Sequence, residues 1–207
     1  MANPTLYGPA YSTYARTARL AMEENGVKYA LEEVDIMQPR SAVHMARQPW
    51  GKVPAFEHDG FKIYETQAIA RYIDESFGGA KLQPADTKKR ARMNQILGIF
   101  DSYGYPSMIS AVVIERMFSP KPDENKIKEA MVSADKTLDA LEGLIGDGKY
   151  LADNEVTLAD LMAVPIIDYF AATPEGKAAL AKRPKVSAWW NRIKDRPSVT
   201  KTKPNLG

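Results

Sequence analysis

The chain has 207 residues, a formal net charge of +2, two histidines and no cysteine. The length allows one large domain or two small ones, and the small net charge gives no reason to expect a nucleic-acid partner. The missing cysteines exclude disulfides, thiolate metal sites and cysteine nucleophiles. There is no histidine cluster for a metal, no signal peptide, and no apolar run long enough to span a bilayer. We therefore expect a cytoplasmic protein that binds neither metal nor membrane.

The first part of the chain alternates strand and helix patterns. Thr5-Leu6-Tyr7 predicts a short strand, and Ser12 or Thr13 stands before a helical pattern that ends at Asn25-Gly26. Residues 29–36 predict a second strand. A strand, a helix and a strand within so short a span indicate a parallel βαβ unit. A weaker helical pattern covers residues 40–47.

The stretch from Gln48 to Glu75 carries the chemistry. Two apolar runs flank His58-Asp59-Gly60 and predict a hairpin, because glycine supplies the positive φ of such turns. A helix follows from Glu65 to Gly78-Gly79, and its first turn offers unpaired N–H groups to an anion. A cis bond before Pro54 would turn the N–H and C=O of Val53 outward. The stretch thus suits a short peptide that carries a carboxylate.

The rest of the chain reads as helices. Residues 80–88 read as a linker, and Tyr103-Gly104-Tyr105-Pro106 predicts a kink in the first long helix. Thr157 and Asp160 predict a capping box before a helix that is apolar on most sides and therefore buried. Trp189 and Trp190 are expected to pack against the domain. The expected helical segments cover residues 93–117, 127–145, 158–167 and 185–195.

Gly51-Lys52-Val53-Pro54-Ala55, followed by Tyr64-Glu65-Thr66, resembles the glutathione-binding half of the glutathione S-transferase family. Residues 150–170 resemble the buried helix and N-capping motif of the family's C-terminal domains. The resemblance implies a thioredoxin-like α/β domain (βαβαββα) over residues 1–79, a linker over 80–88 and an all-helical domain over 89–207. The segment from Tyr7 to Arg16 resembles the serine-type classes, theta- and phi-like, as in bacterial or fungal members.

The resemblance also implies the residues that hold glutathione, the co-substrate. In the family, the residue before the cis-proline pairs with the cysteinyl unit, and an acidic–hydroxyl pair holds the γ-glutamyl end. These roles fall on Val53-Pro54 and on Glu65-Thr66. The hydrogen-bond donor to the thiol is Ser12, with Tyr7 as the alternative. The remaining predicted contacts are Lys52 or Arg40 for the glycyl carboxylate, and Tyr11, Tyr103, Tyr105 and Met108 for an electrophile pocket between the domains.

Two positions depart from the family pattern. Met37-Gln38-Pro39-Arg40 stands where phi-like members have a His-Lys pair, and Gln67 stands where many relatives have arginine. His44 is expected on the surface or in packing.

The implied function is a cytoplasmic, homodimeric detoxification transferase that joins glutathione to small hydrophobic electrophiles. The two-fold contact is expected from the Glu65 helix and the Met93–Phe100 helix. One alternative is an isomerase, dehalogenase or peroxidase that uses the same glutathione site. Another is a non-catalytic binding protein of the same fold.

Overall fold

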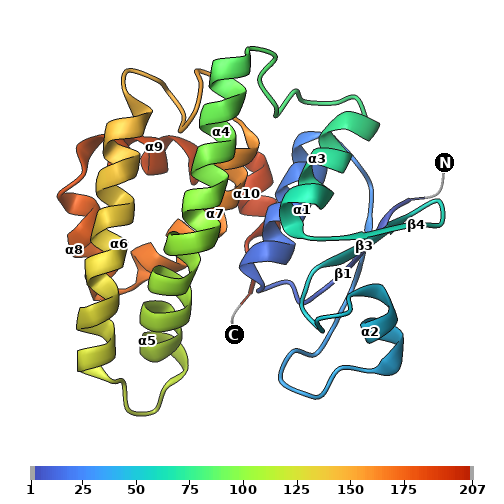
Figure 1. Ribbon diagram of the computed structural model, residues 1–207, viewed down its shortest axis with the longest axis horizontal. Coiled ribbons are helices and arrows are strands. Elements are labelled where there is room, and N and C mark those ends of the chain that lie inside the picture. The colour runs from blue at the N-terminus through green and yellow to red at the C-terminus, as the bar shows by residue number, and fades with distance from the viewer. Residues whose placement is uncertain (1–2, 206–207) are drawn as a thin grey trace. The chain divides into compact units, whose positions relative to one another are not determined.

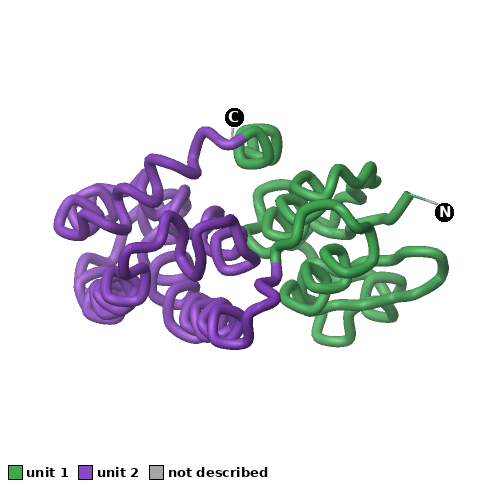
Figure 2. The backbone as a smooth tube through the Cα atoms, turned by 90° about the horizontal axis from the view of Figure 1, so that it is seen from above, with its two compact units in different colours: residues 1–82, 197–207 green, residues 83–196 purple. Residues whose placement is uncertain are grey.

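The computed structural model describes residues 3–205; the predicted domain limits at Met1 and Gly207 lie outside this range. The chain forms two compact units (Figure 2), residues 1–82 with 197–207 and residues 83–196. No helix within the described range is both long and apolar enough to cross a membrane.

The first unit is built on a four-stranded sheet in the order β2-β1-β3-β4. β1 pairs with β2 in parallel and with β3 in antiparallel orientation, and β3 pairs with β4 in antiparallel orientation. The predicted βαβαββα order is confirmed. Its elements are β1 (Thr5–Tyr7), α1 (Thr13–Glu24), β2 (Ala30–Glu32), α2 (Ala42–Arg47), β3 (Ala55–His58), β4 (Phe61–Tyr64) and α3 (Thr66–Ser76).

The strand predicted over residues 29–36 is shorter than expected, because β1 offers few partners. The register of β1 with β2 runs only from Thr5↔Ala30 to Tyr7↔Glu32. The Gly8 N–H donates one more bond to the Glu32 carbonyl, at 2.9 Å, and Pro9 then has no N–H to continue the ladder. The chain leaves the sheet after Glu32.

The sheet lies between two helical layers, with α1 and α3 on one face and α2 on the other (Figure 1). Leu6 and Phe56 are paired across β1 and β3, and their side chains are buried with Ile69 and Ile73 of α3. The predicted hairpin is present. Its two turn residues, Asp59 (φ 49°) and Gly60 (φ 80°), both have positive φ, the geometry that matches the twist of the flanking strands.

The second unit is helical, as predicted. Its elements are α4 (Thr87–Ile99), η1 (Phe100–Val113), α5 (Ile114–Phe118), α6 (Glu124–Ile145), α7 (Leu158–Ala172), α8 (Pro174–Ala181) and α9 (Pro184–Ile193). Where the sequence predicts a kink, η1 is a π-helical segment. The N–H of Ile114 donates to the carbonyl of Ile109, five residues back. This wider turn accommodates Pro106, which has no N–H of its own.

The capping motif at the start of α7 is present and has more partners than predicted. The Asp160 carboxylate is fully buried and accepts from the Thr157 N–H and hydroxyl, both at 2.8 Å. Its other oxygen accepts from the Leu151 N–H at 2.9 Å and from the Trp189 indole N–H at 2.8 Å. Burial raises the pKa of Asp160. Trp189 therefore packs inside the unit, as predicted.

The C-terminal helix α10 (Pro197–Thr202) is not predicted, and it belongs to the first unit rather than to the helical domain expected over residues 89–207. It packs against α1 (Figure 1). The six-residue helix is too short to give a periodic apolar stripe. Arginines of α1, described below, hold its carbonyl groups.

Candidate functional site

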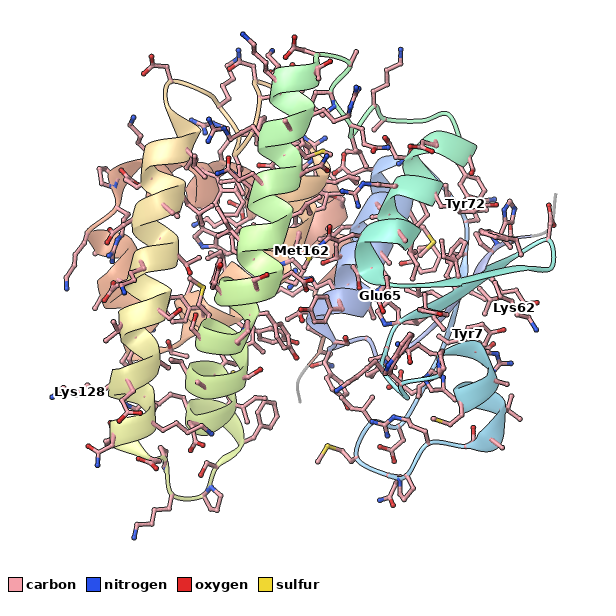
Figure 3. The ribbon with its side chains drawn as sticks, viewed as in Figure 1. Tyr7, Lys62, Glu65, Tyr72, Lys128 and Met162 are labelled. Atoms are coloured by element: carbon pink, nitrogen blue, oxygen red, sulfur yellow. The ribbon has the colours of Figure 1, made fainter. Side chains whose placement is uncertain are left out.

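One end of the sheet collects the segments that the sequence singles out. Tyr7, Ala55 and Tyr64 are neighbours in the register. β1 and β4 end there and β3 begins there, so the loop from Gly8, the Val53-Pro54 segment and Glu65 all lie at this end. Figure 3 labels Tyr7 and Glu65, from the end of β1 and the start of α3.

Gly8 lets two of these segments approach each other closely. A Cβ placed on Gly8 would lie 3.3 Å from Ala15 Cβ and 3.3 Å from Val53 Cβ. This separation is tighter than ordinary van der Waals contact between carbons. Glycine thus allows the start of α1 to lie directly beside Val53.

Ser12 is the N-cap of α1. Its hydroxyl oxygen accepts from the Ala15 N–H at 3.3 Å, and its own N–H donates to the Pro9 carbonyl at 3.0 Å. The side chain is half-buried. Within residues 3–205 the hydroxyl hydrogen has no acceptor. A serine hydroxyl can accept and donate at once, so Ser12 can cap the helix and still donate to a ligand.

Tyr7 points to the α2 side of the sheet. The guanidinium of Arg47 lies 4.0 Å from the centre of its ring, a cation–π contact. Tyr7 also lines a cavity of about 470 Å³ between the sheet and α2, together with Arg40 and Arg47. Ser12 and Val53 do not line this cavity. The two candidate thiol donors thus face different surroundings.

The Val53-Pro54 peptide bond is cis, as predicted. Among the described residues, the N–H and C=O of Val53 have no hydrogen-bond partner. The loop before them is held from α2. The His44 ring donates from Nε2 to the Lys52 carbonyl at 2.7 Å, since a carbonyl can only accept, and the Gln48 amide oxygen accepts from the Lys52 N–H at 3.1 Å.

His44 and Gln48 are site-supporting residues that sequence reasoning missed. Both side chains are buried, at 3% and 2% exposure. His44 lies within α2, and Gln48 is the residue that directly follows its last turn. Their position directly before Gly51-Lys52 was the available signal.

The two cations proposed for the glycyl carboxylate differ in availability. Arg40 donates to the carbonyls of Gly51 (3.0 Å), Asp35 (2.9 Å) and Ile36 (2.8 Å), and also to that of Gln38. Its guanidinium therefore fastens the loop after β2. Lys52 is exposed, and its ammonium group has no partner within residues 3–205.

Glu65 stands at the N-cap position of α3 with φ +71°, a conformation that non-glycine residues rarely adopt. Its exposed side chain makes no capping bond. The Ile69 N–H donates to its carbonyl at 2.9 Å and holds the backbone in place. Strained backbone of this kind gathers at ligand sites. Thr66, the first residue of α3, is 7% exposed and borders the free N–H groups of the first turn.

The predicted pocket residues fall into different environments. Tyr11 in the first unit is 37% exposed and Tyr103 in the second is 59% exposed. Tyr105 is half-buried; burial raises the pKa of its phenol, and a hydrogen bond with Ser110 opposes that shift. Met108 is 0% exposed, which leaves it no surface to offer a ligand. No three His, Cys, Asp or Glu side chains in the described range are grouped to hold a metal ion.

Both halves of the chain match models of one family. Residues 6–81 match the glutathione S-transferase N-terminal domain, and residues 105–197 match its C-terminal domain. The chain is 32% identical over 207 residues to glutathione S-transferase F6 of Arabidopsis thaliana, with 97% of this chain and 99% of the relative covered.

Solved structures agree. Glutathione transferase F7 from Populus trichocarpa matches with a TM-score of 0.86 and 29% identity, over 96% of this chain and 97% of that one. Glutathione S-transferase I from mais, in complex with an atrazine glutathione conjugate, matches with a TM-score of 0.86 and 26% identity, over 97% and 96%. The relatives are plant phi-class (F) proteins, which corrects the expected likeness to theta-like, bacterial or fungal members.

Proposed function

The chain belongs to the glutathione S-transferase family, and on this basis we propose that Ser12 activates the thiol of bound glutathione for attack on a hydrophobic electrophile. Glutathione is the co-substrate, and the reaction conjugates it through sulfur. The observation that supports this role is that the Ser12 hydroxyl has no hydrogen-bond acceptor in the described chain, so it can donate to a ligand. The loop that carries Ser12 also passes beside Val53.

The chemistry requires a thiolate. A free thiol with a pKa of about 8.5 is mostly protonated at neutral pH. A hydrogen bond donated to sulfur favours the thiolate, as does a nearby helix N-terminus. Ser12 offers the donor, and α1 begins at the next residue. The thiolate then forms a bond to the electrophilic carbon as a leaving group departs or a proton is taken up.

The other contacts divide the tripeptide among three elements. We assign the cysteinyl backbone to the free N–H and C=O of Val53. We assign the γ-glutamyl end to Glu65, Thr66 and the first turn of α3. The Glu65 carboxylate would bind the amine of the γ-glutamyl unit, and the N–H groups of the first helical turn would bind its carboxylate. Lys52 takes the glycyl carboxylate, because Arg40 is committed to backbone carbonyls.

Substitution of Ser12 tests the proposal. Ser12 both donates to the thiol and caps α1, so Ser12→Ala removes the donor and the cap together. Ser12→Gly removes the donor but largely keeps the cap, since glycine at an N-cap costs only about a few tenths of a kcal/mol of stability. We expect the bound thiol pKa to rise by about one unit in both variants, with glutathione affinity nearly kept. The thiolate absorbance of the complex against pH measures the shift, and Ser12→Thr is the matched control.

A thiol pKa that is unchanged in Ser12→Gly would move the donor role to Tyr7. A wild-type complex with an unshifted thiol would leave a glutathione-holding protein or an isomerase-like variant. No binding of glutathione in calorimetric titration would contradict the transferase assignment itself.

On family membership we also propose a homodimer that works in the cytoplasm on small electrophiles, in a detoxification role. Exposed apolar side chains on and after α2 support an interface in the first unit, with Val43 61% and Trp50 67% exposed. The expected contact through α3 and α4 stays a prediction. Met93 and Ile96 of α4 are fully buried, so a partner would meet the other side of that helix.

A further inference from the structure

Arg19 of α1 joins three separate parts of the first unit. Its Nη1 donates to the carbonyl of Ala10 at 3.2 Å and to the carbonyl of Thr202 at 3.1 Å. Its Nε donates to the Tyr29 hydroxyl at 3.3 Å. One side chain thus connects the loop before α1, the C-terminal helix and the start of the β2 segment.

Arg16, one turn earlier, is fully buried and acts on the same helix. It donates from Nη2 to the Val199 carbonyl at 3.2 Å and from Nε to the Thr202 hydroxyl at 3.4 Å. The last carbonyls of a helix have no partner within it, and arginine satisfies them with favourable charge. Both arginines therefore hold the C-terminal end of α10.

The other end of α10 is also fastened to α1. Ser198, the second residue of α10, donates its hydroxyl hydrogen to the Glu24 carboxylate. Lys201, near the C-terminal end of α10, also reaches the last turn of α1 and pairs with Glu23 at 2.6 Å. We call Arg16, Arg19 and the α10 carbonyls of Val199 and Thr202 the α10 clamp.

The clamp acts on the loop that carries Ser12. Ala10 lies two residues before Ser12, and its carbonyl accepts directly from Arg19. The backbone bonds of Gly8 and Ser12, at the two ends of this loop, are Gly8 N–H to Glu32, Ser12 N–H to Pro9 and Arg16 N–H to the Ser12 carbonyl. Pro9 contributes no N–H. Arg19 therefore adds a side-chain restraint on the Ala10 carbonyl, in the middle of the loop.

We propose that Arg19 is a positioning residue for the thiol donor and that α10 is part of the thiol-activating apparatus. This proposal rests on the proposed function of Ser12. A hydrogen bond weakens steeply as its angle and distance depart from the ideal, and misplacement of a reacting group by about 1 Å can cost on the order of 10²-fold in rate. Loss of the restraint on Ala10 lets the Ser12 hydroxyl leave the sulfur.

The test compares Arg19→Gln and Arg19→Lys with Lys201→Ala. Lys201 pairs with Glu23 on the exposed side of α10, where its side chain is 72% exposed, so its removal leaves the Ala10 contact intact. We expect the bound thiol pKa to rise by about half a unit to one unit in Arg19→Gln and by less in Arg19→Lys, which keeps one donor group. Lys201→Ala should match the wild type.

A merely structural role would lower the melting temperature of Arg19→Gln and leave the bound thiol pKa unchanged, and that result overturns the proposal. Should Arg19→Gln not fold, Arg19→Lys carries the same comparison. Amide hydrogen exchange over residues 8–14 separates this proposal from that for Ser12. Faster exchange in the Arg19 variants supports the clamp even if Tyr7 proves to be the donor, and unchanged exchange refutes it.

Discussion

Lys52 and Arg40 carry the same charge near one loop but differ in what their donors do. Arg40 donates to the carbonyls of Asp35, Ile36, Gln38 and Gly51. Such forked contacts need the planar guanidinium. Lys52 has its ammonium group exposed and unpartnered in the described chain. We therefore expect exchange of lysine and arginine to be tolerated at position 52 but not at position 40.

We expect Lys52→Ala to weaken glutathione binding about fivefold, as for loss of about 1 kcal/mol from an exposed charge contact, and Lys52→Arg to restore it. Arg40→Lys should keep the charge yet lower the melting temperature and loosen the loop after β2. Calorimetry at two salt concentrations, with thermal unfolding alongside, measures both; Lys62→Ala on β4 is the control. If Lys52→Ala bound glutathione like the wild type and Arg40→Lys lost affinity, the glycyl carboxylate would be assigned to Arg40 instead of Lys52.

At the scale of elements, α7 depends on a carboxylate that serves four donors. Thr157 contributes its N–H and hydroxyl, Leu151 its N–H and Trp189 its indole N–H. Asp160 thus joins the loop before α7, the start of α7 and α9. A buried donor without a partner costs about 1–3 kcal/mol, so the loss of one carboxylate affects three elements at once.

Asp160→Ala is expected to lower the free energy of unfolding by at least about 3 kcal/mol, because several buried donors lose their acceptor. The loss in Asp160→Asn should lie between zero and that of Asp160→Ala. The asparagine keeps one acceptor oxygen, but its NH₂ group faces two donors of the protein. Urea unfolding measures both, with exposed Glu155→Ala as the control. A loss below about 1 kcal/mol, the usual value of a cap alone, would mean that water replaces the carboxylate.

The elements of the first unit could be predicted because local signals mark them. These signals are local in sequence: each involves residues only a few positions apart. They are the alternating apolar residues, the Asp59-Gly60 turn and the Ser12 cap. The α10 clamp could not be predicted, since its contacts join residues more than a hundred positions apart through backbone carbonyls. The same holds for Arg40, because the sequence supplies its charge but not the carbonyls that surround it.

At the scale of the whole molecule, we expect a homodimer in solution. The large exposed Trp50 side chain, beside Tyr64 in an edge-to-face contact, offers an apolar anchor. Trp50→Ser should shift the light-scattering mass towards that of one chain at low concentration, with Phe61→Ser on the hairpin as the control. A wild-type mass equal to one chain would contradict the dimer, and an unshifted Trp50→Ser mass would place its interface elsewhere.

Because residues 197–207 belong to the first unit, the chain cannot be divided into modules by one cut. A chimera that joined residues 1–82 to the helical half of a relative would pair α1 with a foreign C-terminal helix. The buried Arg16 would then face carbonyls that were not selected with it. Exchange of halves between relatives therefore requires two junctions, near residues 82 and 197, so that α10 travels with its own α1.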